Sequence, residues 1–410
     1  MNQDVIYYPE SSIKEAVEKF ETPFFIYEEK RLRENAGRFR DTFRKYFPSF
    51  QPLFAVKANP NPDVLKIIAD EGFLFDASSA GEVWISQKLG IAGMHTGNYL
   101  GADELKMAKD AGFTINLDDV SQLDFLKEIG VPEKLSFRIN PGMGKGEYES
   151  LIMAGPDAKY GIPYEKAADA YKKAQDMGAK HFGIHMMTGS NVLDEGYFPA
   201  IVGRLLDTIA NIKEKTGIEI EFMNIGGGFG VPYRPEEKSL DLERVASGIR
   251  EAVDKKCNDL QIREPVLMAE PGRYVCADAG WLVGRVQVIK DSYKKFVGID
   301  AASNDMPRPS IYGAYHHISV LDGGDKQEEL VSVVGTICEN NDQFGKDREL
   351  PACKRGDIVI IHNCGGHARA MGHNYNGKLR HAEYLIEKNG NLKQIRTSET
   401  VEDLYRGTNI

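Results

Sequence analysis

The sequence predicts a closed (β/α)8 barrel joined to a separate region of β-strands. Short apolar runs alternate with amphipathic stretches over the first two-thirds of the 410 residues, and such alternation indicates a parallel sheet. The apolar runs are continuous, which is typical of strands that are buried on both faces. There are eight such runs, and the ~240 residues that they span are the usual size of a closed barrel of this kind.

The elements of the barrel follow from this alternation. Strands are expected at residues 52–57, 73–77, 94–99, 113–117, 134–139, 181–187, 221–226 and 265–270. Helices are expected at residues 29–45, 62–71, 81–89, 102–111, 119–129, 164–177, 197–214 and 240–256. An open doubly wound sheet is the alternative architecture, but the long all-β tail of the chain argues against it.

From about residue 279 the pattern changes to strands alone. These strands are expected at residues 281–290, 296–299, 316–320, 328–337 and 357–362, and the segment 24–27 near the N-terminus could join them. The predicted domains are therefore a barrel over residues 29–278 and a β-sandwich or β-barrel-like domain. The second domain is expected to combine residues 1–28 with residues 279–410.

Composition and charge exclude several classes of function. The chain is 42% hydrophobic and 27% charged, and its net charge of −10 argues against binding to nucleic acid or to anionic membranes. It has no apolar run of ~18 residues, which a membrane span would need, and the N-terminus does not resemble a signal peptide. The five cysteines include no CxxC pair, so we expect a reducing cytoplasm and neither a disulfide framework nor a structural zinc site.

Polar side chains follow the expected strands, and active sites of such barrels form where the strands end. In chain order they are Lys57, Asp76, Ser78, Ser79, Asn98, Asp118, Arg138, Asn140, His185, Ser190, Gly226–Gly228, Glu270 and Arg273. Single members have structural explanations, since Ser79 or Asp118 could cap a helix. The set as a whole predicts an active site, because the middles of the expected strands are apolar.

Lys57 ends the first expected strand, in the segment Pro52–Asn59. A buried or half-buried lysine can have its pKa lowered enough to act as an amine nucleophile, most often in a Schiff base with an aldehyde cofactor. Taken alone, a solvated charge at a strand end is the more common role of such a lysine, since lysine is rarely buried.

Two later motifs change that balance. The run Gly226–Gly230 (GGGFG) directly follows a strand, where backbone N–H groups can surround an anion; a flexible turn is the alternative. Its spacing fits neither a dinucleotide fingerprint nor a P-loop. Glu270 ends the last strand, where a carboxylate could face a protonated ring nitrogen. An amine, a phosphate cradle and this carboxylate together indicate pyridoxal phosphate. A carboxylate favours decarboxylation, whereas an arginine there would favour a racemase.

The chain resembles the fold-type III pyridoxal-phosphate decarboxylases, which include diaminopimelate and ornithine decarboxylases. The resemblance covers nearly the whole chain. It rests on seven ordered motifs: Phe54–Asn59, Phe75–Ser79, Gly226–Gly230, Glu270–Arg273, Arg308-Pro309 with Tyr312, Cys338-Glu339 and Asn374–Gly377. It implies an alanine-racemase-like barrel with a C-terminal β domain, and a cytoplasmic homodimer with shared active sites that decarboxylates a small amino acid.

The resemblance also implies roles for individual residues. Lys57 would carry the cofactor, Glu270 would pair with the pyridinium nitrogen, and Cys338 would protonate the substrate carbon from the partner subunit. The remaining cofactor contacts would come from Asp76, Arg138, His185, Met187, Ser190, Gly227, Gly228, Gly272, Arg273 and His367. A buried apolar residue on a strand is the alternative for Cys338.

Substrate choice is implied by four residues. Arg273, Arg308 and Tyr312 match the positions by which diaminopimelate decarboxylases hold the distal end of their substrate, and arginine binds carboxylates bidentately. Glu339 would receive the distal ammonium group; ornithine-type enzymes typically carry Asp there. A surface ion pair is the alternative for Arg308. The implied reaction acts at a D-configured carbon of a diamino acid, with meso-diaminopimelate giving L-lysine and CO2.

Two positions depart from the family pattern. The segment 185–190 reads HMMTGS, so Met187 stands where the family has a histidine stacked on the cofactor; a thioether can pack on a ring but cannot donate a hydrogen bond. His367 stands where a tyrosine helps to bind the cofactor. The alternatives are a paralogue acting on D-ornithine, D-lysine or a siderophore or antibiotic precursor, and a non-catalytic cofactor-binding homologue.

Overall fold

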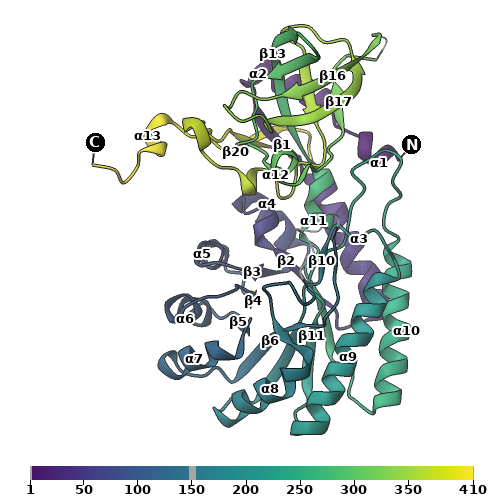
Figure 1. Cartoon of the computed structure of the whole chain (residues 1–410), viewed down its shortest axis with the longest axis vertical. Helices are drawn as coiled ribbons and strands as arrows, with labels where there is room; N and C mark the ends of the chain where they lie inside the picture. Colours follow the sequence, from purple (N-terminus) through teal and green to yellow (C-terminus); the bar gives the residue numbers. More distant parts are fainter. Residues whose placement is uncertain (1, 147–153, 325, 410) are drawn as a thin grey trace. The chain divides into compact units, whose positions relative to one another are not determined.

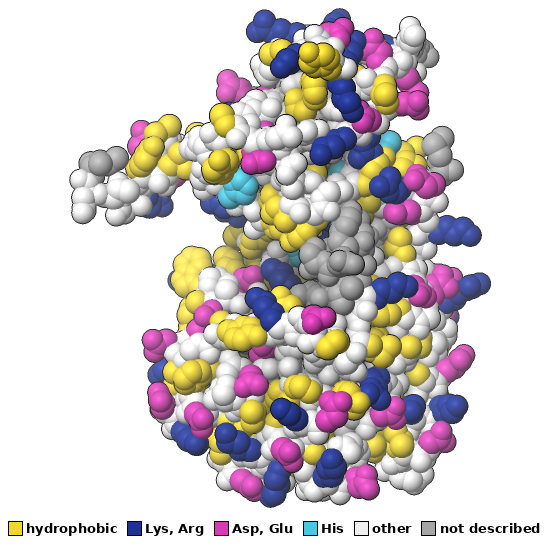
Figure 2. Space-filling view, viewed as in Figure 1, with side chains coloured by type: hydrophobic (Ala, Val, Ile, Leu, Met, Phe, Trp, Pro, Cys, Tyr) yellow, Lys and Arg dark blue, Asp and Glu magenta, His cyan; other side chains and the backbone are white. Residues whose placement is uncertain are grey.

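The computed structural model describes residues 2–146, 154–324 and 326–409. It divides into two compact units. The barrel unit comprises residues 35–231 and 240–274, and the sheet unit comprises residues 1–34, 232–239 and 275–410. Acidic and basic side chains are interspersed over the visible surface of the barrel unit, without a large field of one sign (Figure 2).

Eight parallel strands close the barrel, which confirms the predicted fold class (Figure 1). They are β2 (Gln51–Ala55), β3 (Leu74–Ala77), β4 (Gly93–His95), β5 (Thr114–Leu117), β6 (Lys134–Asn140), β9 (His181–His185), β11 (Ile220–Asn224) and β12 (Val266–Ala269). Neighbours pair in this order, and β12 pairs with β2 to complete the ring. Every expected barrel strand is therefore present.

Helices follow the strands, as the alternation predicts (Figure 1). They are α3 (Glu29–Tyr46), α4 (Pro62–Asp70), α5 (Ala80–Leu89), α6 (Ala102–Asp110), α7 (Leu123–Ile129), α8 (Ala167–Asp176), α9 (Tyr197–Thr216) and α10 (Leu242–Leu260). Helix α10 illustrates the local signals: Asp241 caps its N-terminus by accepting the N–H of Arg244, and the buried residues Val245, Ile249 and Val253 recur at helical spacing.

The barrel interior changes from apolar to polar along the strands. Leu53, Met94 and Phe222 form an apolar cluster. Two residues further along the same faces lie polar side chains such as Thr96 and Asn224, because side chains on one face of a strand recur with a period of two. The expectation of apolar strand middles is therefore wrong for this layer, in which Asn116 and Ser136 are also buried.

The sheet unit contains strands from both ends of the chain. They are β1 (Phe24–Glu28), β13 (Gly280–Asp291), β14 (Lys295–Ile299), β15 (Ile318–Val320), β16 (Glu328–Val334), β17 (Gln343–Pro351), β18 (Ile358–Ile361), β19 (Glu383–Ile386) and β20 (Leu392–Arg396). Strand β1 lies between β13, which is antiparallel to it, and β19, which is parallel to it. Phe24, Ile26, Trp281, Ile360 and Tyr384 form part of the core that these strands bury.

The short helices of the sheet unit are α1 (Gln3–Ile6), α2 (Glu10–Lys19), α12 (Arg308–Tyr312) and α13 (Val401–Leu404). Helix α11 (Gly272–Cys276) spans the junction of the two units. Within the described residues, no helix combines the length and the apolar character that crossing a membrane requires.

Candidate active site

Lys57 and Asp76 form an ion pair at the ends of two adjacent strands. Lys57 lies in the turn Val56–Ala58 that follows β2, and its Nζ is 3.6 Å from Oδ2 of Asp76 on β3. Partial burial lowers the pKa of Lys57, whose side chain is 42% exposed, but the charges of Asp76 and Glu270 outweigh this effect and raise the pKa above its ordinary value. A lowered lysine pKa was the expectation from sequence; the structure differs because two carboxylates act on the amine.

Asp76 is buried and carries an unusual pKa. Burial and the negative charge of Glu270 raise the pKa of Asp76 to about 7, although Lys57 and a hydrogen bond from Thr96 act in the opposite direction. Thr96 Oγ1 donates to Oδ1 of Asp76, whereas no hydrogen bond from the described part of the chain reaches Oδ2. The Asp76 carboxyl therefore titrates near neutral pH, with its Oδ2 3.6 Å from the Lys57 amine.

Glu270 is a buried carboxylate that is held ionised. Its Oε1 accepts a hydrogen bond from Asn224 Nδ2 at 2.7 Å and lies 3.1 Å from His185 Nε2. Burial alone would raise the pKa of Glu270, but His185, Lys57 and Asn224 together hold it below its ordinary value. Asn224 also accepts the N–H of Gly226 at 2.9 Å, so one amide orients both the carboxylate and the start of the glycine loop.

His185 is neutral in this arrangement. Burial lowers its pKa, and this effect outweighs the attraction of Glu270. Asn116 Nδ2 lies 3.4 Å from His185 Nδ1, which makes Nδ1 the acceptor and leaves the ring proton on Nε2, facing Glu270. The neutral imidazole therefore places Nε2 3.1 Å from Oε1 of Glu270 without adding a positive charge.

The glycine loop after β11 can only be built from glycine. Gly226 and Gly228 have φ values of +68° and +90°, and a Cβ on Gly227 would lie 2.5 Å from the carbonyl oxygen of Glu270. The Gly227 N–H lies 3.1 Å from the sulfur of Met187, and no described residue accepts the N–H of Gly228. The loop thus presents backbone donors in the close approach that an anion cradle needs.

Ser190 and Gly272 lie beside this loop. A Cβ on Gly228 would lie 2.7 Å from the carbonyl oxygen of Gly189, next to Ser190. Arg273 Nη2 donates to Ser190 Oγ at 3.2 Å. A Cβ on Gly272 would come 2.9 Å from that of Ala58, so Gly272 allows the segment after β12 to approach the turn that carries Lys57.

The side chain of Arg138 is hydrogen-bonded to the backbone of Met187. Arg138 is buried, donates from Nη1 to Asn98 Oδ1 at 2.9 Å and from Nη2 to the carbonyl oxygen of Met187 at 3.3 Å. Its guanidinium also lies 4.4 Å from the ring centroid of Tyr160. Arg138 therefore positions the segment that carries Met187.

Other polar residues at the strand ends support the backbone. Ser79 caps the N-terminus of α5, which is the structural role that the sequence allowed for it. Ser78 donates hydrogen bonds from its N–H and its Oγ to Glu82 Oε2. Asn140 accepts the N–H groups of Gly142 and Gly155. Asp118 caps no helix and instead accepts the N–H of Gly161 at 3.0 Å. The predicted cluster therefore combines site residues with residues that shape the loops around them.

Arg308 and Tyr312 lie in α12 of the sheet unit. Arg308 is only 1% exposed, so the alternative that it forms an ion pair on the surface is wrong. Its Nη1 lies 3.1 Å from His316 Nε2, and its guanidinium lies 4.7 Å from the ring centroid of Tyr233. His316 Nδ1 donates to the carbonyl oxygen of His362 at 2.8 Å, so Nε2 is free of its proton and accepts from Arg308.

Cys338, Glu339 and His367 lie in loops of the sheet unit. Strand β16 ends at Val334, and Cys338 beyond it is exposed, so the alternative of a buried strand residue is wrong. The Cys338 N–H donates to Asn376 Oδ1 at 3.2 Å. Glu339 is exposed beside it. His367 has a positive φ of +55° in a loop whose preceding residue, Gly366, packs against Cys276.

Sequence reasoning missed Thr96, Asn116, Ser136 and Asn224. The signal was present in the sequence, because these residues lie two positions before Asn98, Asp118, Arg138 and Gly226, respectively. Asn224 precedes Gly226 by two positions, and Asn116 precedes Asp118 by two. The period of two along a strand places such pairs on the same face.

The barrel residues fit pyridoxal phosphate. Asp76 Oδ2, Asn116 Oδ1 and Ser136 Oγ are buried without a hydrogen-bond partner in the described ranges, and such atoms require an explanation. The glycine loop with Ser190 and Arg273 suits a phosphate, Lys57 suits an aldehyde, and the ionised Glu270 suits a protonated ring nitrogen. Amine, cradle and carboxylate are the donor set that this cofactor uses.

Comparisons with known proteins agree with this chemistry. Residues 33–277 match the family profile "Pyridoxal-dependent decarboxylase, pyridoxal binding domain", and residues 273–365 match "Pyridoxal-dependent decarboxylase, C-terminal sheet domain". A diaminopimelate decarboxylase of Methanothermobacter thermautotrophicus is 40% identical over 402 residues, which are 97% of this chain and 94% of that protein. Protein TabA of Pseudomonas amygdali pv. tabaci is 36% identical over 399 residues, 95% of this chain and 92% of that protein.

Solved structures show the same similarity. Diaminopimelate decarboxylase from M. jannaschii in complex with L-lysine has a TM-score of 0.89 and 33% identity, with 97% of this chain and 94% of that chain covered. The Helicobacter pylori enzyme complexed with L-lysine has a TM-score of 0.87 and 27% identity, with 96% of this chain and 98% of that chain covered.

Proposed function

The chain belongs to the pyridoxal-dependent decarboxylases, and on that premise we propose that it decarboxylates meso-diaminopimelate at the D-configured carbon to give L-lysine and CO2. The observation that carries the reaction class is the buried Glu270, held ionised between His185 and Asn224. The choice of substrate is supported by relatives named diaminopimelate decarboxylase that match 94–97% of the chain at 31–40% identity.

When bound, pyridoxal phosphate supplies an aldehyde for amines and a ring that accepts the electron pair released as CO2 leaves. Lys57 would hold the aldehyde, and Asp76 at 3.6 Å would take up the proton that the Lys57 amine must lose. Glu270 would accept the ring N–H. Asn224 and the neutral His185 would keep its carboxylate ionised and fixed in position.

The phosphate would be bound by Gly227, Gly228, Gly272, Ser190 and Arg273. The glycines offer backbone N–H groups, and Arg273 offers a guanidinium whose charge complements a dianion. The remaining cofactor contacts would come from Arg138, Met187 and His367. Met187 would pack its thioether on the ring while its backbone carbonyl is held by Arg138.

The distal end of the substrate would be held by Arg273, Arg308, Tyr312 and Glu339. A guanidinium suits the distal carboxylate, and the Glu339 carboxylate suits the distal ammonium group. Cys338 would return a proton from Sγ to the carbon that has lost CO2. Because Cys338 and Glu339 would act in the site of the neighbouring chain, the working enzyme would be a homodimer.

A second substrate class remains open because of Met187. Its sulfur accepts the Gly227 N–H, an interaction that a stacked histidine would not make in the same way, and Protein TabA is a full-length relative at 36% identity. The alternative is a paralogue that decarboxylates D-ornithine, D-lysine or a precursor of a siderophore or antibiotic. Failure to rescue a lysine auxotroph that lacks diaminopimelate decarboxylase would favour it.

Substitution of the distal-end residues tests the proposal. We expect Arg308→Ala to raise the KM for meso-diaminopimelate by far more than that for D-lysine, which lacks the distal carboxylate. Because Arg308 is buried against Tyr233 and His316, Arg308→Lys serves as the variant that keeps a charge. Glu339→Gln, at an exposed position, should weaken both substrates through the ammonium group. Equal effects of Arg308→Ala on both substrates would contradict the carboxylate role.

A further inference from the structure

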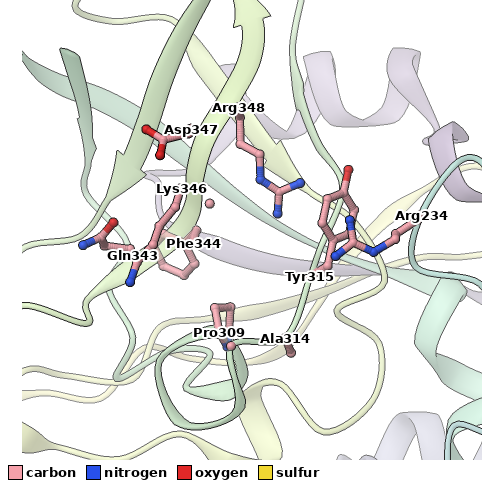
Figure 3. Close-up of a pocket in the computed structure, with 11 residues that line it drawn as sticks. Arg234, Pro309, Ala314, Tyr315, Gln343, Phe344, Lys346, Asp347 and Arg348 are labelled. Atoms are coloured by element: carbon pink, nitrogen blue, oxygen red, sulfur yellow. The ribbon is translucent and has the colours of Figure 1, made fainter. Parts of the chain in front are cut away.

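The sheet unit contains a pocket of about 380 Å³ that involves none of the residues proposed for cofactor or substrate. Its walls come from Arg234, from Pro309 and residues 313–315 around α12, and from β17 at residues 343–348. A volume of this size is in the range of small-molecule sites, roughly 300–1,000 Å³. Its lining is dominated by charged and polar groups (Figure 3).

Tyr315 brings two guanidinium groups together in this pocket. The Cζ atoms of Arg348 and Arg234 lie 3.7 Å and 4.1 Å from the centroid of the Tyr315 ring, and both side chains turn toward that ring (Figure 3). Cation–π attraction explains why two like charges are tolerated so close to one another. The aromatic ring thereby fixes the orientation of both donors.

These arginines have no carboxylate partner among the residues that the structure describes. Asp347 lines the pocket, but both of its oxygens lie 2.8 Å from Lys294 Nζ. Glu237 Oε2 accepts the backbone N–H groups of Tyr233 and Arg234, at 2.8 Å and 3.1 Å, and makes no contact with either guanidinium. Lys346 adds a further positive charge to the wall.

The lining residues therefore carry an excess of positive charge. The carboxylates of Glu236 and Glu237 act on Tyr315, but within the described residues neither forms an ion pair with Arg234 or Arg348. Burial holds the pKa of Arg348 below its ordinary value, and the nearby charge of Arg234 adds to this effect although Tyr315 opposes it. Proteins generally pair a half-buried charge such as that of Arg348. An anion between the two guanidiniums would supply the missing partner.

We infer that this pocket binds the phosphate group of a small phosphorylated molecule through Arg234 and Arg348. Two planar guanidiniums can each engage a tetrahedral dianion bidentately, and Lys346 adds a point charge. A single carboxylate carries one negative charge whereas a phosphate dianion carries two, so two guanidiniums favour phosphate.

Calorimetric titration of the full, cofactor-loaded chain with inorganic phosphate tests this site. Loading the enzyme first keeps phosphate out of the glycine cradle. We expect saturable binding of one phosphate per chain, weakened at least tenfold by Arg348→Gln and by Arg234→Gln, which corresponds to about 1.4 kcal/mol. Tyr315→Phe retains the ring and should retain binding. Arg355→Gln is the matched control, since Arg355 is exposed and lies outside the pocket.

Three outcomes would overturn the inference. They are the absence of saturable binding, equal weakening by Arg355→Gln, and binding that neither pocket variant changes. Tighter binding of citrate than of phosphate, lost in the same variants, would replace the phosphate assignment by a polycarboxylate one. Thermal unfolding of each variant checks folding, and Arg234→Gln at its exposed position decides the matter if Arg348→Gln does not fold.

Discussion

Replacing Glu270 by glutamine is the change that should disturb the candidate active site most selectively. The substitution preserves the shape of the side chain and removes only its negative charge. In the wild type, Oε1 of Glu270 accepts from Asn224 Nδ2 at 2.7 Å and lies 3.1 Å from Nε2 of His185. Both groups face the same oxygen, so a glutamine whose amide oxygen takes the place of Oε1 would keep both contacts without the charge.

The expected loss follows from the missing charge. A hydrogen bond to a charged group contributes about 1.5–3 kcal/mol, and removal of one preorganised electrostatic contact at a reacting centre typically lowers kcat by about 10²–10³-fold, or roughly 2.7–4 kcal/mol. We therefore expect kcat to fall at least ~10²-fold while KM changes much less, because Glu270 would act on the cofactor ring and not on the distal end of the substrate.

The pH dependence gives an independent readout. The charge of Glu270 helps to raise the pKa of Asp76 to about 7, so Glu270→Gln should lower that pKa. If proton uptake by Asp76 limits the rate at acidic pH, the acidic limb of the pH–rate profile then moves to lower pH. Steady-state CO2 release across a pH series measures both effects.

The barrel contains a matched control. Glu221 pairs with His181 at 2.6 Å, as Glu270 pairs with His185, but these side chains are 43% and 52% exposed. Exposed pairs contribute little, so Glu221→Gln should leave kcat and the pH profile unchanged. Near-normal kcat in Glu270→Gln, or equal losses in the two variants, would refute the role given to Glu270.

Three further changes probe other parts of the barrel. Thr96→Val removes a hydrogen bond that lowers the pKa of Asp76, so the acidic limb of the pH–rate profile should move to higher pH by up to about one unit; an unmoved limb would contradict this. Gly228→Ala meets a φ of +90° and a carbonyl oxygen at 2.7 Å and should weaken cofactor binding more than about tenfold in a fluorescence titration, whereas Gly324→Ala, whose methyl meets nothing within 4 Å, should not. Burial lowers the pKa of His95 from 6.5 to about 4, so the folded state loses stability as the pH falls from 6.5 toward 4; His95→Leu should remove up to about 3 kcal/mol of that loss in urea unfolding, and an unchanged pH slope would exclude it.

The barrel was predictable because its strands are short apolar runs whose spacing leaves room for one helix each. The same reasoning missed β19, whose sequence EYLI is short although it is buried. It also missed two further strands: β17, whose sequence QFGKDRELP mixes charged and apolar residues without a run, and β20, whose sequence LKQIR is half-polar. Both lie at the ends of the sheet path. Edge strands need fewer apolar side chains, so hydrophobic patterns detect them poorly.

The site was predictable in its residue types but not in its electrostatics. Glycine runs and strand-end charges are visible in a sequence, and they located Lys57, Glu270 and the glycine loop. The pKa of Lys57 could not be derived, because it depends on the distance to Asp76 and on the charge of Glu270. Such distances arise only when non-adjacent strands close into a barrel.

Burial of single polar residues was the other limit. Arg308 is buried by stacking on Tyr233, a residue 75 positions away in the chain, and no local pattern indicates that contact. Cys338 lies in an apolar stretch that suggested a strand, yet β16 ends at Val334 and the cysteine is exposed. Both outcomes depend on tertiary packing, which overrides local propensity.

The most direct test of the central claim is product analysis after incubation of the cofactor-loaded protein with a panel of amino acids. The panel comprises meso-diaminopimelate, D-lysine, D-ornithine, L-lysine, L-ornithine and L-arginine. Our account predicts L-lysine and CO2 from meso-diaminopimelate, with little reaction of the other five. Formation of a diamine from a D-amino acid, with meso-diaminopimelate inert, would contradict it and assign Met187 and His367 to a different substrate.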